Sequence, residues 1–232
     1  MKRDSQSGEF RALFGIEPEE LGPNCVLLPF ARRCLLAALG VGGLSRGKLY
    51  RASAGRELSV VVTGIGPALA GDAVLRLAAA GCRRAVLLGA CGLVGPGRIG
   101  EIVVPSRNLA REAFSDWLLE DPSPWVMGTP ASALSAALAE DLGARCTLNA
   151  SVGSLLLSER RLGLLQAEGV ESIEMECGAV LAAAAAAGIE AAAVLVVTDL
   201  VGRRPFYRRL PDSVFSALAE GARGICRVLG GS

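Results

Sequence analysis

Short apolar runs alternate along the chain with longer amphipathic segments, and this pattern predicts buried strands covered by helices. Glycine clusters and polar turns separate the segments. We therefore expect an α/β fold, and we favour one domain over two small ones for 232 residues. The predicted strands cover residues 25–30, 58–62, 85–89, 101–104, 146–152 and 191–197. The predicted helices cover residues 31–39, 68–80, 132–142, 158–168, 212–229 and a segment that begins near 174–176 and ends at Gly188.

Three further segments have no clear hydrophobic period. Residues 1–24 are polar and are expected to be irregular, with at most one short helix. Residues 106–130 contain both tryptophans and are expected to form a long surface loop, a frequent place for binding function. Residues 201–210 read VGRRPFYRRL, which predicts an arginine-rich loop after the last strand.

Three carboxylates flank the most apolar part of the chain, residues 172–200. Glu174 and Glu176 lie where a helix is expected to begin, and anionic side chains suit that end of the helix dipole. Thr198 and Asp199 follow an apolar strand, and open α/β sheets bind ligands at the carboxyl ends of their strands. These acids are therefore candidate site residues. The structural alternatives are a first-turn helix acid for Glu176 and a turn cap for Asp199.

Composition excludes several kinds of chemistry. The chain has no histidine, which removes Ser-His and Cys-His nucleophiles, histidine metal sites and a histidine proton shuttle. Acid–base chemistry must therefore come from carboxylates. The seven cysteines are odd in number and contain no CxxC pair, which argues against a disulfide framework or a zinc site.

Charge and hydropathy restrict the partners and the compartment. The net charge of +1 gives no reason to expect a nucleic-acid partner. The N-terminus lacks the apolar core of a signal peptide. Gly188 and Glu190 interrupt the one long apolar run, residues 179–197, so we expect a helix and a strand there and no membrane span. A reducing cytoplasm is the expected location.

Glycine turns follow two of the predicted strands. The segment 63–67, TGIGP, joins a strand to a helix, a geometry in which backbone N–H groups can approach an anion. No acid ends the next strand and no GxxxxGK[ST] is present, so NAD and a P-loop nucleotide are not expected. The glycines of residues 89–100 would let a flat ligand lie on backbone, or they simply form turns. The Arg32-Arg33 pair opens a predicted helix, where it could meet a bound anion or remain solvated.

Four motifs occur in a fixed order: GIG at 64–66, GACG at 89–92 with GRIGEIVVPS at 97–106, EMEC at 174–177 and VVTD at 196–199. In this order the chain resembles the nucleoside phosphorylase and nucleosidase superfamily, over roughly residues 25–229. The resemblance implies a single-domain three-layer α/β fold whose central mixed sheet is partly closed into a barrel and flanked by helices. It implies a domain of residues 25–232 behind an N-terminal extension, 1–24. It also implies a homo-oligomer, either a dimer or a trimer of dimers.

The resemblance further implies an enzyme that cleaves the N-glycosidic bond of a nucleoside without a metal or an organic cofactor. Glu176 matches the glutamate that holds the ribose hydroxyls, and Met175 would pack on the sugar face. Asp199 matches the acid that hydrogen-bonds or protonates purine N7, with Thr198 in place of a serine. Because the uridine-acting branch lacks this aspartate, a purine is favoured. The remaining expected substrate-binding residues are Ile173, Glu174, Ala90, Cys91 and Gly92.

The acceptor side of the expected site departs from both branches of the family. Leu87 and Ala90 stand where phosphorylases have an arginine and a Ser or Thr. Arg33 or Cys34 stands where the hydrolytic branch has a water-activating glutamate, and aliphatic residues near Leu155 replace the aromatic that stacks on the base. The expected phosphate-binding residues are Gly66, Arg32 or Arg33, and Arg46, the last reaching in from a neighbouring subunit.

Three hypotheses follow for the activity. The leading one is phosphorolysis of a purine or modified nucleoside, with inorganic phosphate as co-substrate. The second is hydrolysis of a methylthioadenosine, adenosylhomocysteine or futalosine type of substrate. The third is a nucleoside-binding protein without turnover.

Overall fold

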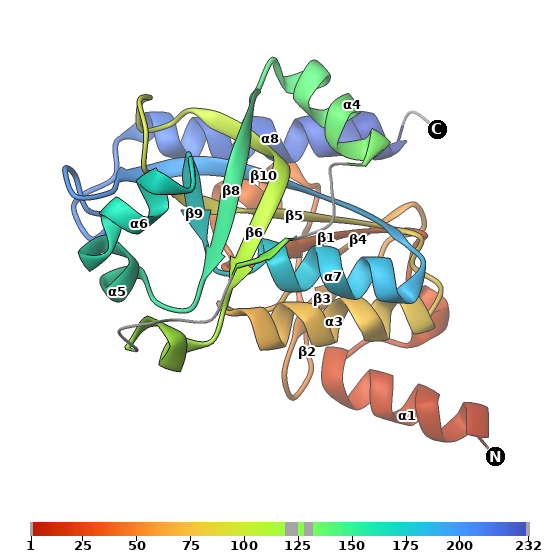
Figure 1. Cartoon of the computed structure of the whole chain (residues 1–232). Coiled ribbons are helices and arrows are strands. Elements are labelled where there is room, and N and C mark those ends of the chain that lie inside the picture. The colour runs from red at the N-terminus through yellow and green to blue at the C-terminus, as the bar shows by residue number, and fades with distance from the viewer. Residues whose placement is uncertain (1, 119–124, 128–131, 231–232) are drawn as a thin grey trace.

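A ten-stranded mixed sheet forms the centre of the fold (Figure 1). The computed structural model describes residues 2–118, 125–127 and 132–230. The strands are β1 (Asn24–Leu28), β2 (Ser45–Arg46), β3 (Arg51–Ser53), β4 (Leu58–Val62), β5 (Arg84–Leu93), β6 (Ile102–Arg111), β7 (Val126–Met127), β8 (Arg145–Val152), β9 (Ser172–Glu174) and β10 (Glu190–Leu200).

One half of this sheet closes on itself. The strand order is β10-β6-β8-β9-β5-β1-β4-β3-β2, and β10 also pairs in parallel with β5, so β10, β6, β8, β9 and β5 form a ring. The other half continues outward from β5 through the parallel strands β1 and β4 to the antiparallel edge strands β3 and β2. The predicted central mixed sheet, partly closed into a barrel, is confirmed.

Helices cover both faces of the open half of the sheet, which gives three layers (Figure 1). Helices α3 and α7 pack together on one face, and α2 and α4 pack with α8 on the other. Side chains alternate along β1: Cys25 and Leu27 enter the core on one side, and Val26 and Leu28 enter the core on the other. The helices are α1 (Lys2–Phe14), α2 (Arg33–Ala38), α3 (Pro67–Ala79), α4 (Ala133–Leu142), α5 (Leu155–Arg160), α6 (Leu162–Ala167), α7 (Cys177–Ala187) and α8 (Asp212–Gly230), with single 3₁₀ turns η1 (Pro18–Glu20) and η2 (Phe114–Trp117).

The N-terminal helix packs on the body of the protein. Phe10 and Phe14 stack on each other, and Phe14 stacks on Tyr50 at 4.5 Å between ring centroids. Phe14 is fully buried, so residues that the sequence predicts to be irregular contribute to the core. The division of the chain at residue 24 stays a prediction.

Several predicted elements differ from the structure. The prediction of a loop over residues 106–130 is wrong for its first residues, because β6 continues to Arg111 and pairs with β8. The pairing shifts register at a bulge between Pro105 and Arg107. Residues 106–130 also contain η2 and β7, while residues 119–124 and 128–130 lie outside the described part. The predicted helix 158–168 is two short helices, α5 and α6. The helix expected to begin near residues 174–176 starts at Cys177 with Glu176 as its N-cap, whereas Glu174 ends β9.

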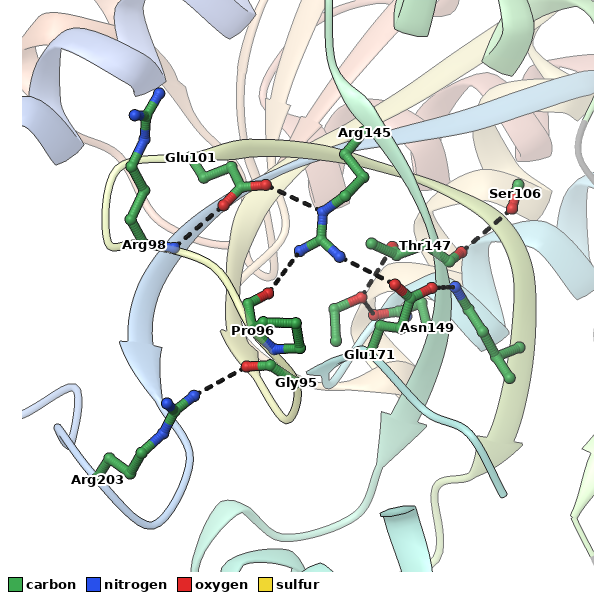
Figure 2. Close-up of polar contacts among 12 residues, drawn as sticks. Gly95, Pro96, Arg98, Glu101, Ser106, Arg145, Thr147, Asn149, Glu171 and Arg203 are labelled. Atoms are coloured by element: carbon green, nitrogen blue, oxygen red, sulfur yellow. Dashed lines mark hydrogen bonds and ion pairs between the residues drawn. The ribbon is translucent and has the colours of Figure 1, made fainter. Parts of the chain in front are cut away.

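A network of ion pairs fixes the loop between β5 and β6 to the barrel. Arg145 on β8 donates to Glu101 at 3.0 Å and to Glu171 at 2.9 Å, and it also reaches the carbonyl of Pro96 (Figure 2). Arg203 holds the same loop through the Gly95 carbonyl at 2.8 Å. The contacts therefore anchor the loop that begins just after Ala90–Gly92, near the end of β5.

No helix within the described ranges combines the length and the apolar character that a bilayer crossing requires.

Candidate active site

A cavity of about 330 Å³ opens at the carboxyl ends of β1, β5 and β10. This is the edge at which α/β sheets bind ligands. Its walls are largely apolar, and most of the expected substrate-binding residues line it. The lining residues are Pro29, Phe30, Arg32, Ile65, Ala90, Cys91, Gly92, Leu155, Ile173, Glu174, Met175, Glu176, Thr198, Asp199, Phe206, Leu210, Val214, Phe215 and Leu218.

Asp199 enters the cavity because β10 changes register just before it. Val197 pairs with Cys91 and Asp199 pairs with Gly92, so Thr198 forms a bulge that re-aims the strand end. A Cβ on residue 92 would lie 2.6 Å from the Asp199 carboxylate, so only glycine leaves room for it. The carboxylate accepts a hydrogen bond from the Thr198 hydroxyl at 2.9 Å.

Burial raises the pKa of Asp199, and the Thr198 hydrogen bond opposes this shift without cancelling it. A raised pKa is what a carboxylic acid needs in order to hand a proton to a leaving group near neutral pH. The pKa of Asp199 is therefore shifted in the direction that a general acid requires.

Glu174 is buried and fully engaged with the protein. One carboxylate oxygen accepts from Asn149 at 2.9 Å and from Ser151 at 2.5 Å. The other accepts the backbone N–H groups of Glu176 at 2.5 Å and Cys177 at 2.7 Å. With four donors on two oxygens, Glu174 fixes the start of α7.

Glu176 lies at the N-cap of α7 and is only 5% exposed. Its Oε1 accepts the backbone N–H of Gly66, from the turn between β4 and α3, at 2.7 Å. Burial raises the pKa of Glu176 to about 8, and the negative charge of Glu174 adds to the shift, while the Gly66 hydrogen bond opposes it. A carboxyl group with several free lone pairs is a suitable acceptor for vicinal hydroxyls.

Cys91 also lines the cavity, and the environment of its thiol limits its reactivity. It is 3% exposed, and burial raises the pKa of its thiol well above the ordinary value, with the charge of Asp199 adding to the shift. Because the thiolate is the nucleophile, this environment disfavours nucleophilic chemistry at Cys91.

The expected phosphate-binding residues are not all brought together. Arg32, the N-cap of α2, lines the cavity, whereas Arg33 and Arg46 do not. Arg46 is exposed on the edge strand β2, far along the sheet order from β10. The N–H of Gly66, expected to bind phosphate, instead donates to Glu176.

Sequence reasoning missed much of the apolar wall. Phe206 and Leu210 come from the arginine-rich loop, and Phe215 comes from the first turn of α8. A sequence signal was available, because these apolar residues lie within 16 positions after the candidate acid Asp199. Leu155 does line the cavity, so an aliphatic residue stands at the place expected from the sequence.

Within the ranges that the structure describes, no three Cys, Asp or Glu side chains are grouped so that they could hold a metal ion. The chemistry available to the cavity's own side chains is therefore that of an acid, Asp199, and a second carboxyl group, Glu176. The absence of a cofactor stays a prediction.

A family model described as the phosphorylase superfamily matches residues 27–215. The chain belongs to the phosphorylase superfamily. The match covers most of the chain, from β1 to the first turn of α8, and it includes every lining residue named above except Leu218. The resemblance inferred from the four sequence motifs is confirmed.

Solved structures of this superfamily share the fold over nearly the whole chain. AMP nucleosidase from Bacteroides thetaiotaomicron is 16% identical, with a TM-score of 0.73 and 98% of each chain covered. Purine nucleoside phosphorylase from Toxoplasma gondii, in complex with immucillin-H, is 18% identical, with a TM-score of 0.73 and 93% of each chain covered. Uridine phosphorylase from Vibrio fischeri ES114 is 14% identical, with a TM-score of 0.73 and coverage of 94% of this chain and 95% of that one. A search of curated protein sequences gives no significant match.

Proposed function

We propose that this superfamily member is an enzyme that cleaves the N-glycosidic bond of a purine or modified purine nucleoside. The observation that carries the proposal is that Asp199, with a raised pKa, and the buried Glu176 line one cavity of nucleoside size. The solved neighbours include phosphorylases and nucleosidases, which agrees with this reaction class.

The reaction breaks the bond between ribose C1′ and a ring nitrogen. Positive charge develops on the sugar and negative charge on the departing base. Glu176 accepts hydrogen bonds from the ribose hydroxyls. As pH rises through its pKa of about 8, the ionised carboxylate also stabilises the cationic sugar. Protonated Asp199 gives its proton to purine N7, so the base leaves neutral. Met175 and Ile173 pack on the sugar, and the apolar wall with Phe206 and Phe215 encloses the base.

We propose inorganic phosphate as the acceptor, with free base and sugar 1-phosphate as products. A phosphate oxygen forms a bond to C1′ while the bond from C1′ to nitrogen breaks. Arg32 is the cation that lines the cavity, and Arg46 is exposed on the edge strand β2, available to a neighbouring subunit of a homo-oligomer. Arg33 is a further exposed cation next to Arg32.

Hydrolysis is the second candidate, and one observation favours it. The Gly66 N–H, expected to hold phosphate, is already bound to Glu176 at 2.7 Å. The apolar residues Leu87 and Ala90 stand where phosphorylases have phosphate-binding side chains. In this case water takes the place of phosphate, and the products are free base and free sugar.

Product analysis separates the candidates. The full chain is incubated with a panel of purine nucleosides, including 5′-substituted ones, with and without inorganic phosphate, and the products are identified by chromatography. Phosphorolysis predicts release of base that depends on phosphate, together with sugar 1-phosphate. Phosphate-independent release with free sugar supports hydrolysis. If a purine nucleoside binds by calorimetry but is not cleaved on long incubation, the protein is a binding protein and the enzymatic proposal is wrong.

A further inference from the structure

Glu112, which follows the last residue of β6, contacts the same helix start that carries Glu176. Its Oε1 accepts the backbone N–H of Ala179 in the first turn of α7 at 2.9 Å. A Cβ on Gly178 would lie 2.6 Å from this oxygen, so the glycine is needed for the approach. Glu112 and Glu174 therefore bind successive parts of one helix start, from two different strands.

The first helical N–H groups are otherwise without partners inside a helix, so side-chain acceptors determine how this end is held. Ser151 on β8 accepts the remaining N–H, that of Gly178, at 2.7 Å. The backbone of Glu176 thus sits at the centre of contacts from β6, β8 and β9. A change in any of these acceptors is expected to move the Glu176 side chain.

Glu112 forms no ion pair with the described residues around it, within the ranges 2–118, 125–127 and 132–230. The neighbouring Arg111 lies with its guanidinium 4.3 Å from the ring centroid of Trp125. Helix α3, which packs on α7, carries Asp72 and Arg76, and Arg76 pairs with Glu9. The short helix α5 follows β8 and carries only exposed charges, Glu159 and Arg160.

The charged groups that act on Glu112 and Glu176 are therefore chiefly carboxylates. Burial raises the pKa of Glu112 to about 7, and the charge of Glu174 adds to this shift, against the Ala179 hydrogen bond. The charge of Glu112 in turn contributes to the raised pKa of Glu176. Asp199 and Arg32 line the same cavity as Glu176 but are not among the groups that shift it.

We propose that Glu112 is a positioning residue for the sugar-binding carboxyl group: it holds the first turn of α7, at the helix start that carries Glu176, and places a further carboxyl group beside that start. The proposal rests on the proposed function, since sugar binding by Glu176 is part of it. Glu112 does not line the cavity, and it acts through the helix start and through charge.

The test compares Glu112→Gln with wild type by ¹³C NMR of labelled glutamate carboxyl groups, with the Glu176 signal assigned from Glu176→Gln. Glu112→Gln keeps an oxygen for the Ala179 N–H but removes the charge, so the Glu176 midpoint moves to lower pH by about half a unit or more. The acid limb of kcat/KM moves in the same direction. An unchanged Glu176 midpoint in this variant overturns the proposal.

Two further variants distinguish the effect of the Glu112 charge from the effect of its hydrogen bond to the first turn of α7. Glu190→Gln is the matched control, because Glu190 accepts the backbone N–H of Leu134 at the start of α4 in the same manner. It is expected to leave the Glu176 midpoint in place, and a shift as large as that of Glu112→Gln contradicts a specific role. Glu112→Asp keeps the negative charge, so the titration midpoint of Glu176 should stay near the wild-type value. Because the shorter side chain holds the first turn of α7 less well, the KM for the nucleoside should rise about threefold or more. The titration needs no substrate, so it remains decisive even if no nucleoside is cleaved.

Discussion

The two ends of the cavity are built in different ways. Asp199 and Glu176 are held by contacts from the barrel strands: Asp199 through a bulge beside Gly92, and Glu176 through the helix start that Glu174 binds. The expected acceptor end depends on turns and an edge strand, and only Arg32 of its three arginines lines the cavity. The proposed sugar and base end is therefore built within one chain, whereas the arginines expected at the phosphate end are not brought together at the cavity.

The largest expected effect is at the base end. Asp199→Asn keeps the shape and the Thr198 contact but cannot donate an acidic proton, so kcat should fall by about 10²- to 10⁴-fold, the usual contribution of a general acid. Steady-state assay of base release measures it. The matched control is Asp141→Asn, which removes an exposed ion pair with Arg227 and should leave kcat within about twofold. Full activity of Asp199→Asn would exclude Asp199 as the acid.

The next effect is at the sugar. Glu176→Gln removes the carboxyl acceptor of the ribose hydroxyls. At pH above about 8, where this carboxyl group is ionised, the loss costs about 1.5–3 kcal/mol, or roughly 10- to 150-fold in kcat/KM. A 2′,3′-dideoxy nucleoside should lose most of this difference, because it lacks the hydroxyls that Glu176 binds. If wild type and variant discriminate the dideoxy analogue equally, Glu176 does not bind the sugar hydroxyls.

A smaller effect is expected at the acceptor end. Arg32→Gln should raise the KM for phosphate by about tenfold, since it removes one charge-assisted contact, and leave the KM for the nucleoside nearly unchanged. Arg33→Gln is the neighbouring control, because Arg33 does not line the cavity. Equal effects of the two substitutions would show that local charge, and not a built contact, attracts phosphate.

The last effect concerns stability and not activity. The pKa of Glu176 is raised from 4.5 to about 8, so the folded protein keeps a proton that the unfolded chain releases over this window. Stability from this group is therefore present at low pH and is lost as pH rises from about 5 to 8. A shift of this size corresponds to about 5 kcal/mol. Thermal melts should therefore show a decline in Tm over this range that is smaller in Glu176→Gln by about 10 °C or more, at about 2–4 °C per kcal/mol. Parallel curves for the two proteins would contradict a raised pKa.

The sequence predicts the buried strands well because their runs are apolar on both faces. Leu58–Val62 has the predicted bounds, and β1 and α8 differ by one or two residues. The continuation of β6 through Pro105 and Arg107 is not predictable from periodicity, because its polar side chains are tolerated at a bulge in the barrel. Strands β2 and β3 are too short to give a pattern.

The candidate site also has features that local sequence predicts and features that it does not. The place of Asp199 in the cavity is predictable because an acid at a strand end is local information. Its role as an acid stays a prediction. Two other features depend on the tertiary packing of segments that are distant in the sequence. One is the hydrogen bond between Gly66 and Glu176. The other is that Arg33 and Arg46 do not line the cavity. Glu112 gives no sequence signal, since its contact with Ala179 joins positions 67 residues apart.

A crystal structure of Glu176→Gln with a bound purine nucleoside tests the assignment of the two ends most directly. The account predicts purine N7 within about 3 Å of the Asp199 carboxyl group and the ribose hydroxyls at the residue 176 side chain. A nucleoside bound with its sugar at Asp199, or outside this cavity, would contradict it.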